Sequence, residues 1–234
     1  MSDRTALVLG ASGLVGDLLL RRLAADGRWT RVVTLGRRPL ETAGPTHEDH
    51  VVDFGRLDEQ AALFACDDLF CCLGTTIKTA GSREAFRRVD VELPRWAAQL
   101  AHSAGATQML LVSALGADPD SRIFYNRAKG EAERAVSEVG FEAVQIFRPS
   151  LLAGDRDEVR VGERVALAVL RPLSPLLGGA LAALRPTEAT DVARAMVAVG
   201  ARRPSGVSVY EPGAIRDEAA TAAAQGRFGV PPAR

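Results

Sequence analysis

One segment near the amino terminus restricts the fold of this chain more than any other. The run Gly10 to Gly16 has the spacing Gly-x-x-Gly-x-x-Gly; it follows the apolar stretch Ala6 to Leu9 and opens a helical pattern, Leu14 to Ala25. A side chain in this turn would clash with a bound diphosphate, and one at the last glycine would hold the helix away from the sheet. The helix N-terminus offers free N–H groups to phosphates. The run therefore predicts a strand–turn–helix unit that binds a dinucleotide, with contacts from Gly10, Ser12, Gly13, Leu14, Val15 and Gly16.

Beyond this turn, short runs rich in β-branched residues alternate with longer segments that repeat apolar residues at helical spacing. Such alternation is typical of βαβ units, which form parallel sheets covered on both faces. We therefore predict an α/β fold of the Rossmann type with a doubly wound parallel sheet. The expected strands are 6–9, 32–35, 51–54, 69–73, 109–113 and 143–147, and the expected helices are 14–25, 83–103 with a kink at Pro94, and 122–139, which ends before Gly140.

The pattern changes after Arg148, where turn-rich pieces punctuated by proline replace the regular alternation. We interpret residues 150–217 as holding the elements of a small C-terminal substrate cap. These include a helix over 187–199, with Thr187 or Thr190 near its N-cap, and a short closing strand over 207–210. The alanine-rich segment 218–234 is expected to be a flexible tail. Residues 1–217 are thus predicted to form a single domain, in keeping with a length of 234 residues.

Charge and cysteine content narrow the classes of partner. Lys+Arg and Asp+Glu both total 29, so no basic excess indicates nucleic acid or an anionic membrane, and a small molecule is the expected substrate. The three cysteines and three histidines show no metal-ligand spacing, so no metal site is expected and the histidines are interpreted as surface residues. The odd cysteine count favours a reducing cytoplasm over a disulfide framework.

The lysine content and the most apolar region add two further expectations. Only Lys78 and Lys129 are lysines among the 29 basic residues, a bias that suggests a GC-rich bacterial genome. The region Val165 to Leu184 is interrupted by arginine and proline, and therefore lacks the unbroken apolar run of a membrane span. The polar residues 1–4 contain no secretory segment, so no cleavage is expected. An apolar face around 167–184 is open to three readings: core packing, a greasy substrate or a homodimer contact.

The end of the second strand indicates which nicotinamide is bound. An enzyme that uses NAD usually places a carboxylate there to bind the ribose 2′-hydroxyl, whereas this chain has Arg37 and Arg38. Two guanidiniums suit a 2′-phosphate, so NADP(H) is the expected cofactor, with NAD(H) as the alternative if the arginines only reflect composition. Further contacts are expected along the adenosine side of the cofactor, from Asp53, Phe54, Cys72, Leu73, Gly74 and Thr75.

Tyr125 and Lys129 lie four residues apart in an expected helix, and therefore on one helix face. A tyrosine has an ordinary pKa near 10, and a nearby ammonium can lower it toward the range in which protons exchange at neutral pH. Lys129 could also hold the nicotinamide ribose hydroxyls. Ser113, at the end of the fifth strand, could orient a substrate carbonyl and stabilise its developing negative charge. These three residues are the predicted catalytic group; the alternative is a strand-end serine beside a solvated helix face.

Taken together, Gly10, Gly13, Gly16, Ser113, Tyr125 and Lys129 resemble the short-chain dehydrogenase/reductase family. More narrowly, the runs 10–16, 35–39, 70–76 and 147–150 resemble its atypical branch, which contains the NADPH-binding Tat-interacting tumour suppressor and bacterial relatives. The resemblance covers residues 5–156. It implies that Arg148, Pro149 and Ser150 flank the nicotinamide. It also places Asp90 where better-studied reductases of the family often carry asparagine.

The resemblance implies an NADP(H)-dependent oxidoreductase of a small carbonyl or alcohol substrate. Some relatives in the same branch bind NADPH chiefly to regulate partner proteins. An NADP(H)-binding regulatory or sensor protein without physiological turnover is therefore the alternative. From the short stretch of sequence after Asp155 we expect too small a cap for a nucleotide-sugar pocket, so a nucleotide-sugar epimerase is the less expected activity.

Overall fold

The computed structural model describes residues 3–153 and 185–225, and seven of the described strands form one large parallel sheet. The strand order is β3-β2-β1-β4-β5-β6-β9, so the carboxyl ends of β1 and β4 lie side by side where the winding direction changes. Ligands of open α/β sheets bind at this switch point, and the predicted fold class is confirmed. The strands are β1 (Arg4–Leu9), β2 (Trp29–Gly36), β3 (His47–Val51), β4 (Asp68–Cys71), β5 (Gln108–Val112), β6 (Ala143–Phe147) and β9 (Gly206–Tyr210).

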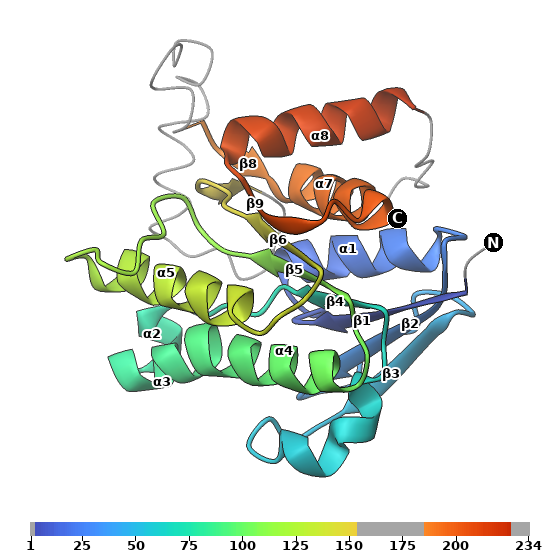
Figure 1. Ribbon diagram of the computed structural model, residues 1–234, viewed down its shortest axis with the longest axis horizontal. Helices are drawn as coiled ribbons and strands as arrows, with labels where there is room; N and C mark the ends of the chain where they lie inside the picture. The colour runs from blue at the N-terminus through green and yellow to red at the C-terminus, as the bar shows by residue number, and fades with distance from the viewer. Residues whose placement is uncertain (1–2, 154–184, 226–234) are drawn as a thin grey trace.

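Helices cover both faces of the sheet (Figure 1). One face carries α1 (Leu14–Ala24) and α7 (Ala189–Arg202), with α8 (Pro212–Ala224) packed against α7. The other face carries α4 (Leu93–Ser103) and α5 (Phe124–Ser137), with the short helices α2 (Ile77–Ala80) and α3 (Arg83–Arg87) beside them. Each face has its own apolar core, because successive side chains of β1 point to opposite faces of the sheet. Ala6 and Val8 pack on the side of α1 and α7, and Leu7 and Leu9 pack on the side of α4.

The long helix expected over 83–103 is continuous but not uniformly α-helical. Between α3 and α4 the chain forms a π-helical turn, η2 (Arg88–Glu92), and Pro94 occupies the first turn of α4. Proline has no N–H to donate to the preceding turn, so the irregularity falls where a kink was expected. Gly140 has φ +106° after α5, in the left-handed region that favours glycine at a helix end.

Several expectations need correction. The third strand covers residues 47–51 and not 51–54. It was misplaced because β3 is a polar edge strand and lacks the apolar run that predicts a buried strand. A 3₁₀ segment, η1 (Leu57–Phe64), follows it. His47 is buried rather than on the surface. The tail was expected to be flexible from Glu218, which is wrong as far as Ala224, since α8 buries one face there, including Ala219 and Ala222.

The C-terminal part also differs from the expected cap. Helix α7 and strand β9 belong to the main layers. Thr187, expected near the N-cap of the helix, lies in a short strand directly before the N-cap residue, Glu188. Only the two-stranded pair of β7 (Leu152–Ala153) and β8 (Thr187–Glu188) lies apart from the main sheet in the described ranges. The expected apolar face at 167–184 and the segment 226–234 lie outside the described residues.

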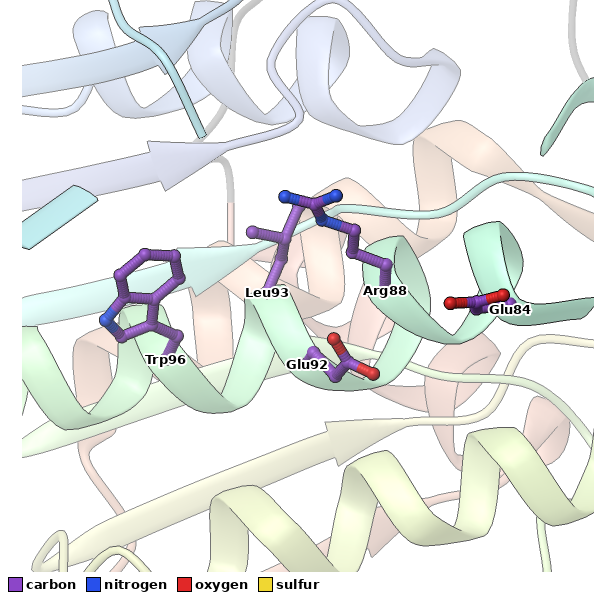
Figure 2. A pocket seen from close by; sticks show the side chains of 5 residues that line it. All are labelled: Glu84, Arg88, Glu92, Leu93 and Trp96. Carbon is purple, nitrogen blue, oxygen red and sulfur yellow. The ribbon is translucent and has the colours of Figure 1, made fainter. Parts of the chain in front are cut away.

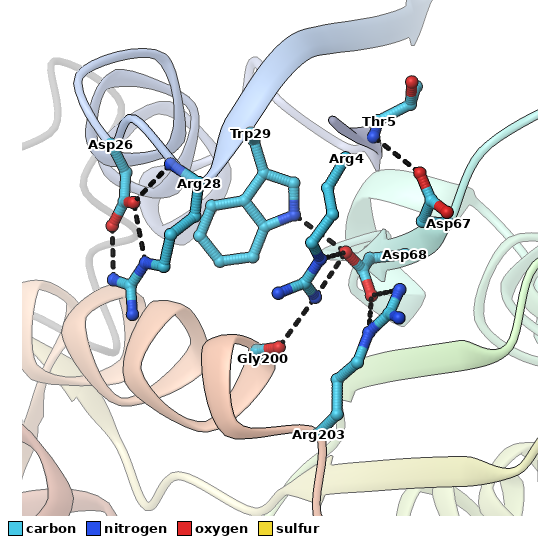
Figure 3. Close-up of polar contacts among 9 residues, drawn as sticks. All are labelled: Arg4, Thr5, Asp26, Arg28, Trp29, Asp67, Asp68, Gly200 and Arg203. Carbon is cyan, nitrogen blue, oxygen red and sulfur yellow. Dashed lines mark hydrogen bonds and ion pairs between the residues drawn. The ribbon is translucent and has the colours of Figure 1, made fainter. Parts of the chain in front are cut away.

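A buried ionic cluster fixes the amino-terminal edge of the sheet (Figure 3). Asp68, fully buried at the start of β4, accepts hydrogen bonds from the guanidiniums of Arg4 and Arg203 and from the indole N–H of Trp29, at 2.6–3.1 Å. Arg4 also donates to the carbonyl of Gly200 at the end of α7. The cluster therefore ties three strands to the last helix turn at the edge opposite the glycine turn.

Candidate cofactor and catalytic site

Gly10 and Gly16 are required by the backbone packing of the turn itself. Gly10 has φ +79°, and a Cβ there would lie 2.5 Å from the carbonyl oxygen of Cys72. A Cβ on Gly16 would lie 2.1 Å from the carbonyl oxygen of Gly10. Both positions exclude a side chain, because the turn presses against the end of β4 and α1 begins directly above it. The crowding at Gly10 thus comes first from β4 and not only from a bound diphosphate.

The first turn of α1 faces the same edge of the sheet. Gly13 is its N-cap and donates its own N–H to the carbonyl of Gly10 at 2.9 Å, and no side chain caps the helix in the described part of the chain. The next N–H groups, from Leu14 to Gly16, are those that bind anions at helix N-termini. Ser12 is exposed beside them, whereas Val15 is buried in the core, so Val15 can contribute only through its backbone.

The segment after β4 runs beside the glycine turn. Cys72 donates its backbone N–H to the carbonyl of Leu9 at 2.8 Å, which holds the two strand ends together. Leu73 is half-buried and Gly74 is exposed, so the segment offers backbone and apolar surface to a ligand. Burial raises the pKa of the Cys71 thiol to about 11 and raises the pKa of Cys72 as well. Thiols held protonated in this way are poor nucleophiles, and they pack as small apolar side chains.

The predicted contacts for the adenosine half lie at the neighbouring strand ends. Arg37 and Arg38 follow β2, and both are exposed, with no ion pair to any carboxylate in the described residues. Asp53 is exposed after β3 and accepts the backbone N–H of Gly55 through Oδ1 at 2.8 Å. Phe54 packs partly into the core. These residues line one edge of the sheet with free cationic and apolar groups, as an adenosine phosphate requires.

Lys129 is buried and held by a carboxylate that the sequence did not assign as its partner. Its Nζ lies 2.7 Å from Oδ1 of Asp90 in the π-helical turn, and Oδ2 of Asp90 accepts the backbone N–H of Thr75 at 2.9 Å. Burial alone would lower the pKa of Lys129, but the Asp90 carboxylate and then the Tyr125 hydroxyl act in the opposite direction, and the pKa of Lys129 is raised overall. A Cβ on Gly74 would lie 3.9 Å from Nζ, so this ammonium borders the segment after β4.

Tyr125 lies one turn before Lys129 on α5. Its side chain is 37% exposed, and its ring packs against Phe86 of α3 with centroids 5.8 Å apart. The phenol is therefore supported on one side and open to solvent on the other. The structure places the predicted tyrosine and lysine on one helix face beside the strand edge that carries the glycine turn.

Ser113 is buried, and its hydroxyl has a specific partner. Its Oγ donates to Oε1 of Glu133 at 2.5 Å, and Glu133 accepts two further hydrogen bonds from Arg148, at 2.9 and 2.6 Å. Arg148 also pairs with Glu211 at 3.1 Å, and the hydrogen bonds to Glu133 raise its pKa. In this arrangement the Ser113 hydrogen is taken, so Ser113 can accept a hydrogen bond but cannot donate one to a developing negative charge.

Sequence reasoning missed Glu133, although its position carried a signal. Tyr125, Lys129 and Glu133 are spaced by four residues and share one face of α5. A carboxylate one turn beyond a Tyr-x-x-x-Lys pair, in a helix packed on the sheet, needs a buried cationic or hydroxyl partner. Arg148 and Ser113, at the ends of β6 and β5, supply both.

The segment 148–150, expected to flank the nicotinamide, already uses much of its backbone. Arg148 donates its N–H to the carbonyl of Tyr210, and the carbonyl of Pro149 accepts the N–H of Leu115, both at 2.9 Å. Ser150 donates its hydroxyl to the carbonyl of Arg185 at 2.6 Å. A cofactor could therefore contact this segment only through backbone and side-chain groups that take no part in these hydrogen bonds.

A hollow of about 300 Å³ opens along α3, η2 and α4 (Figure 2). Its lining residues are Glu84, Arg88, Glu92, Leu93 and Trp96. Arg88 Nη2 would lie 3.8 Å from a Cβ on Gly55, so the hollow adjoins the segment that carries Asp53 and Phe54. It therefore extends the predicted adenosine edge toward α4.

Two negative observations concern the described ranges only. Among residues 3–153 and 185–225, no group of three or more His, Cys, Asp or Glu side chains could hold a metal ion. No helix within these ranges is both long and apolar enough to cross a bilayer.

The chain is similar to curated proteins over most of its length and to solved structures in its fold. The chain is 40% identical to Protein HTATIP2 of Rattus norvegicus over 170 residues, covering 71% of this chain and 70% of that protein. It is 36% identical to Protein fmp52, mitochondrial, of Emericella nidulans over 166 residues, covering 68% and 71%. The structure of MoeE5 in complex with UDP-glucuronic acid and NAD superposes with a TM-score of 0.68 at 20% identity, covering 89% of this chain and 75% of that one.

These relatives come from a mammal and a fungus, and one is named as mitochondrial. The expected bacterial source and cytoplasmic location therefore stay predictions. A family model described as the NAD dependent epimerase/dehydratase family matches residues 6–211, which is most of the chain. With a Rossmann sheet, a glycine turn at its switch point and a Tyr-x-x-x-Lys face beside it, this chain belongs to the NAD-dependent epimerase/dehydratase family.

Proposed function

We propose that this protein is an NADP(H)-dependent oxidoreductase of the short-chain dehydrogenase/reductase type, acting on a small carbonyl or alcohol substrate. The observation that carries the proposal is the position of Lys129. Its buried ammonium is fixed by Asp90 and borders Gly74, so the Tyr125–Lys129 face meets the segment that follows β4. Buried charged groups with a specific partner gather at functional sites, and this one lies at the edge of the sheet where the glycine turn is.

The residues present fit a dinucleotide. The crowded turn at Gly10 and Gly16 and the uncapped start of α1 suit a diphosphate, and the exposed Arg37 and Arg38 suit a 2′-phosphate. When bound, the nicotinamide supplies or takes up the hydride. The preference for NADP(H) over NAD(H) rests on the two arginines alone.

The side chains of α5 would then act on the substrate oxygen. Tyr125 holds or moves a proton at that oxygen through its exposed hydroxyl. Lys129, fixed in its charged form by Asp90, supplies a positive charge next to the phenol and hydrogen-bond donors toward the ribose. Ser113 offers lone pairs only, because Glu133 takes its hydrogen, so its part is to orient a hydroxyl rather than to stabilise an oxyanion.

The test compares Tyr125→Phe with the unaltered protein. Turnover is followed by the absorbance of NADPH across a panel of small aldehydes, ketones and enones, and NADPH affinity is measured by calorimetry. We expect Tyr125→Phe to lose at least about a hundredfold in kcat, the scale of general acid–base catalysis, with NADPH affinity unchanged within about threefold. Undiminished turnover in Tyr125→Phe would remove the catalytic assignment.

A second candidate is an NADP(H)-binding protein that regulates a partner without turnover. One observation favours it: two of the three predicted catalytic groups are already paired within the fold, Ser113 with Glu133 and Lys129 with Asp90. This candidate predicts tight NADPH binding without oxidation of the cofactor by any member of the panel. A homodimer remains a further proposal, to be tested by sedimentation over a concentration series.

A further inference from the structure

The loop that carries Arg37 and Arg38 is fixed at both ends by hydrogen bonds. On one side, the carbonyl of Gly36 accepts the N–H of Val52 at 2.9 Å. On the other, the N–H of Leu40 donates to Oδ2 of Asp49 at 2.8 Å. Only Arg37, Arg38 and Pro39 lie between these two anchors, and the proline ring restricts the backbone of Arg38. Two exposed arginines are thus presented from a short span with little freedom.

A chain of polar groups, two of them buried and Asp49 half-buried, supports this loop from the sheet. Thr34 of β2 lies directly opposite Asp49 of β3 in the parallel ladder, and its hydroxyl donates to Oδ1 of Asp49 at 2.5 Å. His47, two residues before Asp49, contacts the same hydroxyl through Nε2 at 2.8 Å. Its Nδ1 lies 3.0 Å from the backbone N of Ala43, at the far side of the loop.

The direction of each hydrogen in this chain follows from the donors. A backbone N–H can only donate, so Nδ1 of His47 accepts from Ala43 and carries no hydrogen. The neutral ring then carries its hydrogen on Nε2 and donates a hydrogen bond to the Thr34 hydroxyl, which in turn donates a hydrogen bond to Asp49. Burial lowers the pKa of His47, more than the nearby carboxylate of Asp49 raises it, which favours the neutral ring that this arrangement needs.

Both oxygens of Asp49 are therefore used within the protein. One takes the Thr34 hydroxyl and the other takes the N–H of Leu40. A carboxylate near the end of β2 would otherwise suit the 2′-hydroxyl of an NAD ribose. Here it points into the loop and holds the backbone that presents the arginines, while the neighbouring Glu48 points to the other side and pairs with Arg31 at 2.7 Å.

We propose that Asp49, together with Thr34 and His47, positions Arg37 and Arg38 and so sets the preference for a dinucleotide that carries a 2′-phosphate. This inference rests on the proposed function, because it assumes that the two arginines bind that phosphate. Asp49 acts through the arginines and touches no ligand. Holding them in place before binding reduces the freedom that they lose when the phosphate arrives.

The test measures dissociation constants for NADPH and NADH by calorimetry at one fixed salt concentration, since contacts to a phosphate are screened by salt. For Asp49→Ala we expect NADPH to bind about tenfold more weakly and NADH to change by less than about twofold. Thr34→Val, which removes the hydroxyl but keeps the side-chain shape, should shift the NADPH to NADH ratio in the same direction. Glu48→Ala is the matched control on the same strand and should leave the ratio unchanged.

A double-variant cycle separates this inference from the proposed function. In the background Arg37→Ala with Arg38→Ala, the NADPH advantage should already be lost, and adding Asp49→Ala should change NADPH binding by less than about twofold. If the arginine pair leaves the ratio unchanged, the proposed NADP(H) preference fails. If the arginine pair lowers the ratio while Asp49→Ala and Thr34→Val leave it unchanged, only the positioning role fails.

One other outcome overturns the inference. A selective loss of NADH affinity in Asp49→Ala would mean that Asp49 contacts the ribose directly. Circular dichroism shows whether each variant is folded. Should Asp49→Ala fail to fold, Thr34→Val and Asp49→Asn carry the same test, because asparagine places an acceptor atom at only one of the two carboxylate positions that Leu40 and Thr34 use.

Discussion

Replacing Asp90 by asparagine should destabilise the protein strongly, because it leaves Lys129 buried without its counter-charge. Lys129 Nζ and Asp90 Oδ1 are 2.7 Å apart, and the side chains of Lys129 and Asp90 are 8% and 0% exposed, respectively. At an effective dielectric near 20, that separation gives a gross attraction of about 6 kcal/mol. Much of it offsets the cost of burying both charges. Breaking a buried pair by removing one partner costs about 3–5 kcal/mol of unfolding free energy, and this is the expected loss for Asp90→Asn.

Urea unfolding followed by circular dichroism measures this loss. For a chain of this size it corresponds to a fall in Tm of about 6–20 °C. The deficit should shrink as pH is raised, because without Asp90 the burial of Lys129 is no longer outweighed, its pKa falls, and the amine can lose its proton. The matched control is Glu59→Gln, which breaks an exposed pair with Arg56 and should cost less than about 1 kcal/mol.

A second variant decides whether the lost charge or the changed shape of residue 90 causes the loss of stability in Asp90→Asn. Asp90→Asn combined with Lys129→Met removes both charges, so the double variant should be more stable than Asp90→Asn alone by at least about 1 kcal/mol. A loss below about 1 kcal/mol in Asp90→Asn, or a double variant no more stable than the single one, would mean that the charge of Asp90 is not what stabilises the buried Lys129.

Three further predictions concern stability and reactivity away from the phenol. Asp68→Asn should lower the unfolding free energy, measured by urea unfolding, by about 3–5 kcal/mol, since it leaves two arginines around an uncharged buried group. NADPH affinity measured by calorimetry should stay within about twofold, because Asp68 lies at the opposite edge of the sheet, and a large loss of affinity in the folded variant would contradict this. Burial lowers the pKa of His47 below its ordinary 6.5, so the unfolded chain takes up a proton first as pH falls, and the unfolding free energy should decrease below about pH 6.5. His47→Gln should reduce this dependence of unfolding free energy on pH, and an unchanged dependence would count against the role of His47. Burial raises the pKa of Cys71 to about 11, so a thiol reagent should label it only as the protein unfolds, and rapid labelling of the folded protein would disagree.

The layout of the sheet and its glycine turn followed from local sequence. Gly10 and Gly16 were identified by their spacing between a strand and a helix, and the structure shows that neither position can hold a Cβ. The pairing of Tyr125 with Lys129 on one face followed from helical periodicity. The glycine spacing and the Tyr-x-x-x-Lys spacing are patterns within a few residues of sequence, which is why the sequence alone predicted them, although the crowding at Gly10 comes from the distant Cys72.

Features that depend on distant contacts were harder to predict. Glu133 and Ser113 are 20 residues apart, and only the packing of α5 on the sheet joins them. Strand β3 was misplaced because its polar residues include His47 and Asp49, which are paired with Thr34 of the neighbouring strand. The order in α8 arises from small residues packed against α7, a signal that an alanine-rich sequence shares with flexible tails.

The proposed function requires an NADP dinucleotide on the glycine turn, with its nicotinamide ribose against the Tyr125–Lys129 face. A crystal structure of the protein with NADPH would show whether the cofactor lies there. We expect the diphosphate at the N–H groups of α1, the ribose hydroxyls within hydrogen-bond distance of Lys129 Nζ, and the Tyr125 hydroxyl on the same side as the reactive ring carbon. If Lys129 and Tyr125 were directed away from the ribose of the bound cofactor, neither could act on the substrate and the proposed function would be wrong.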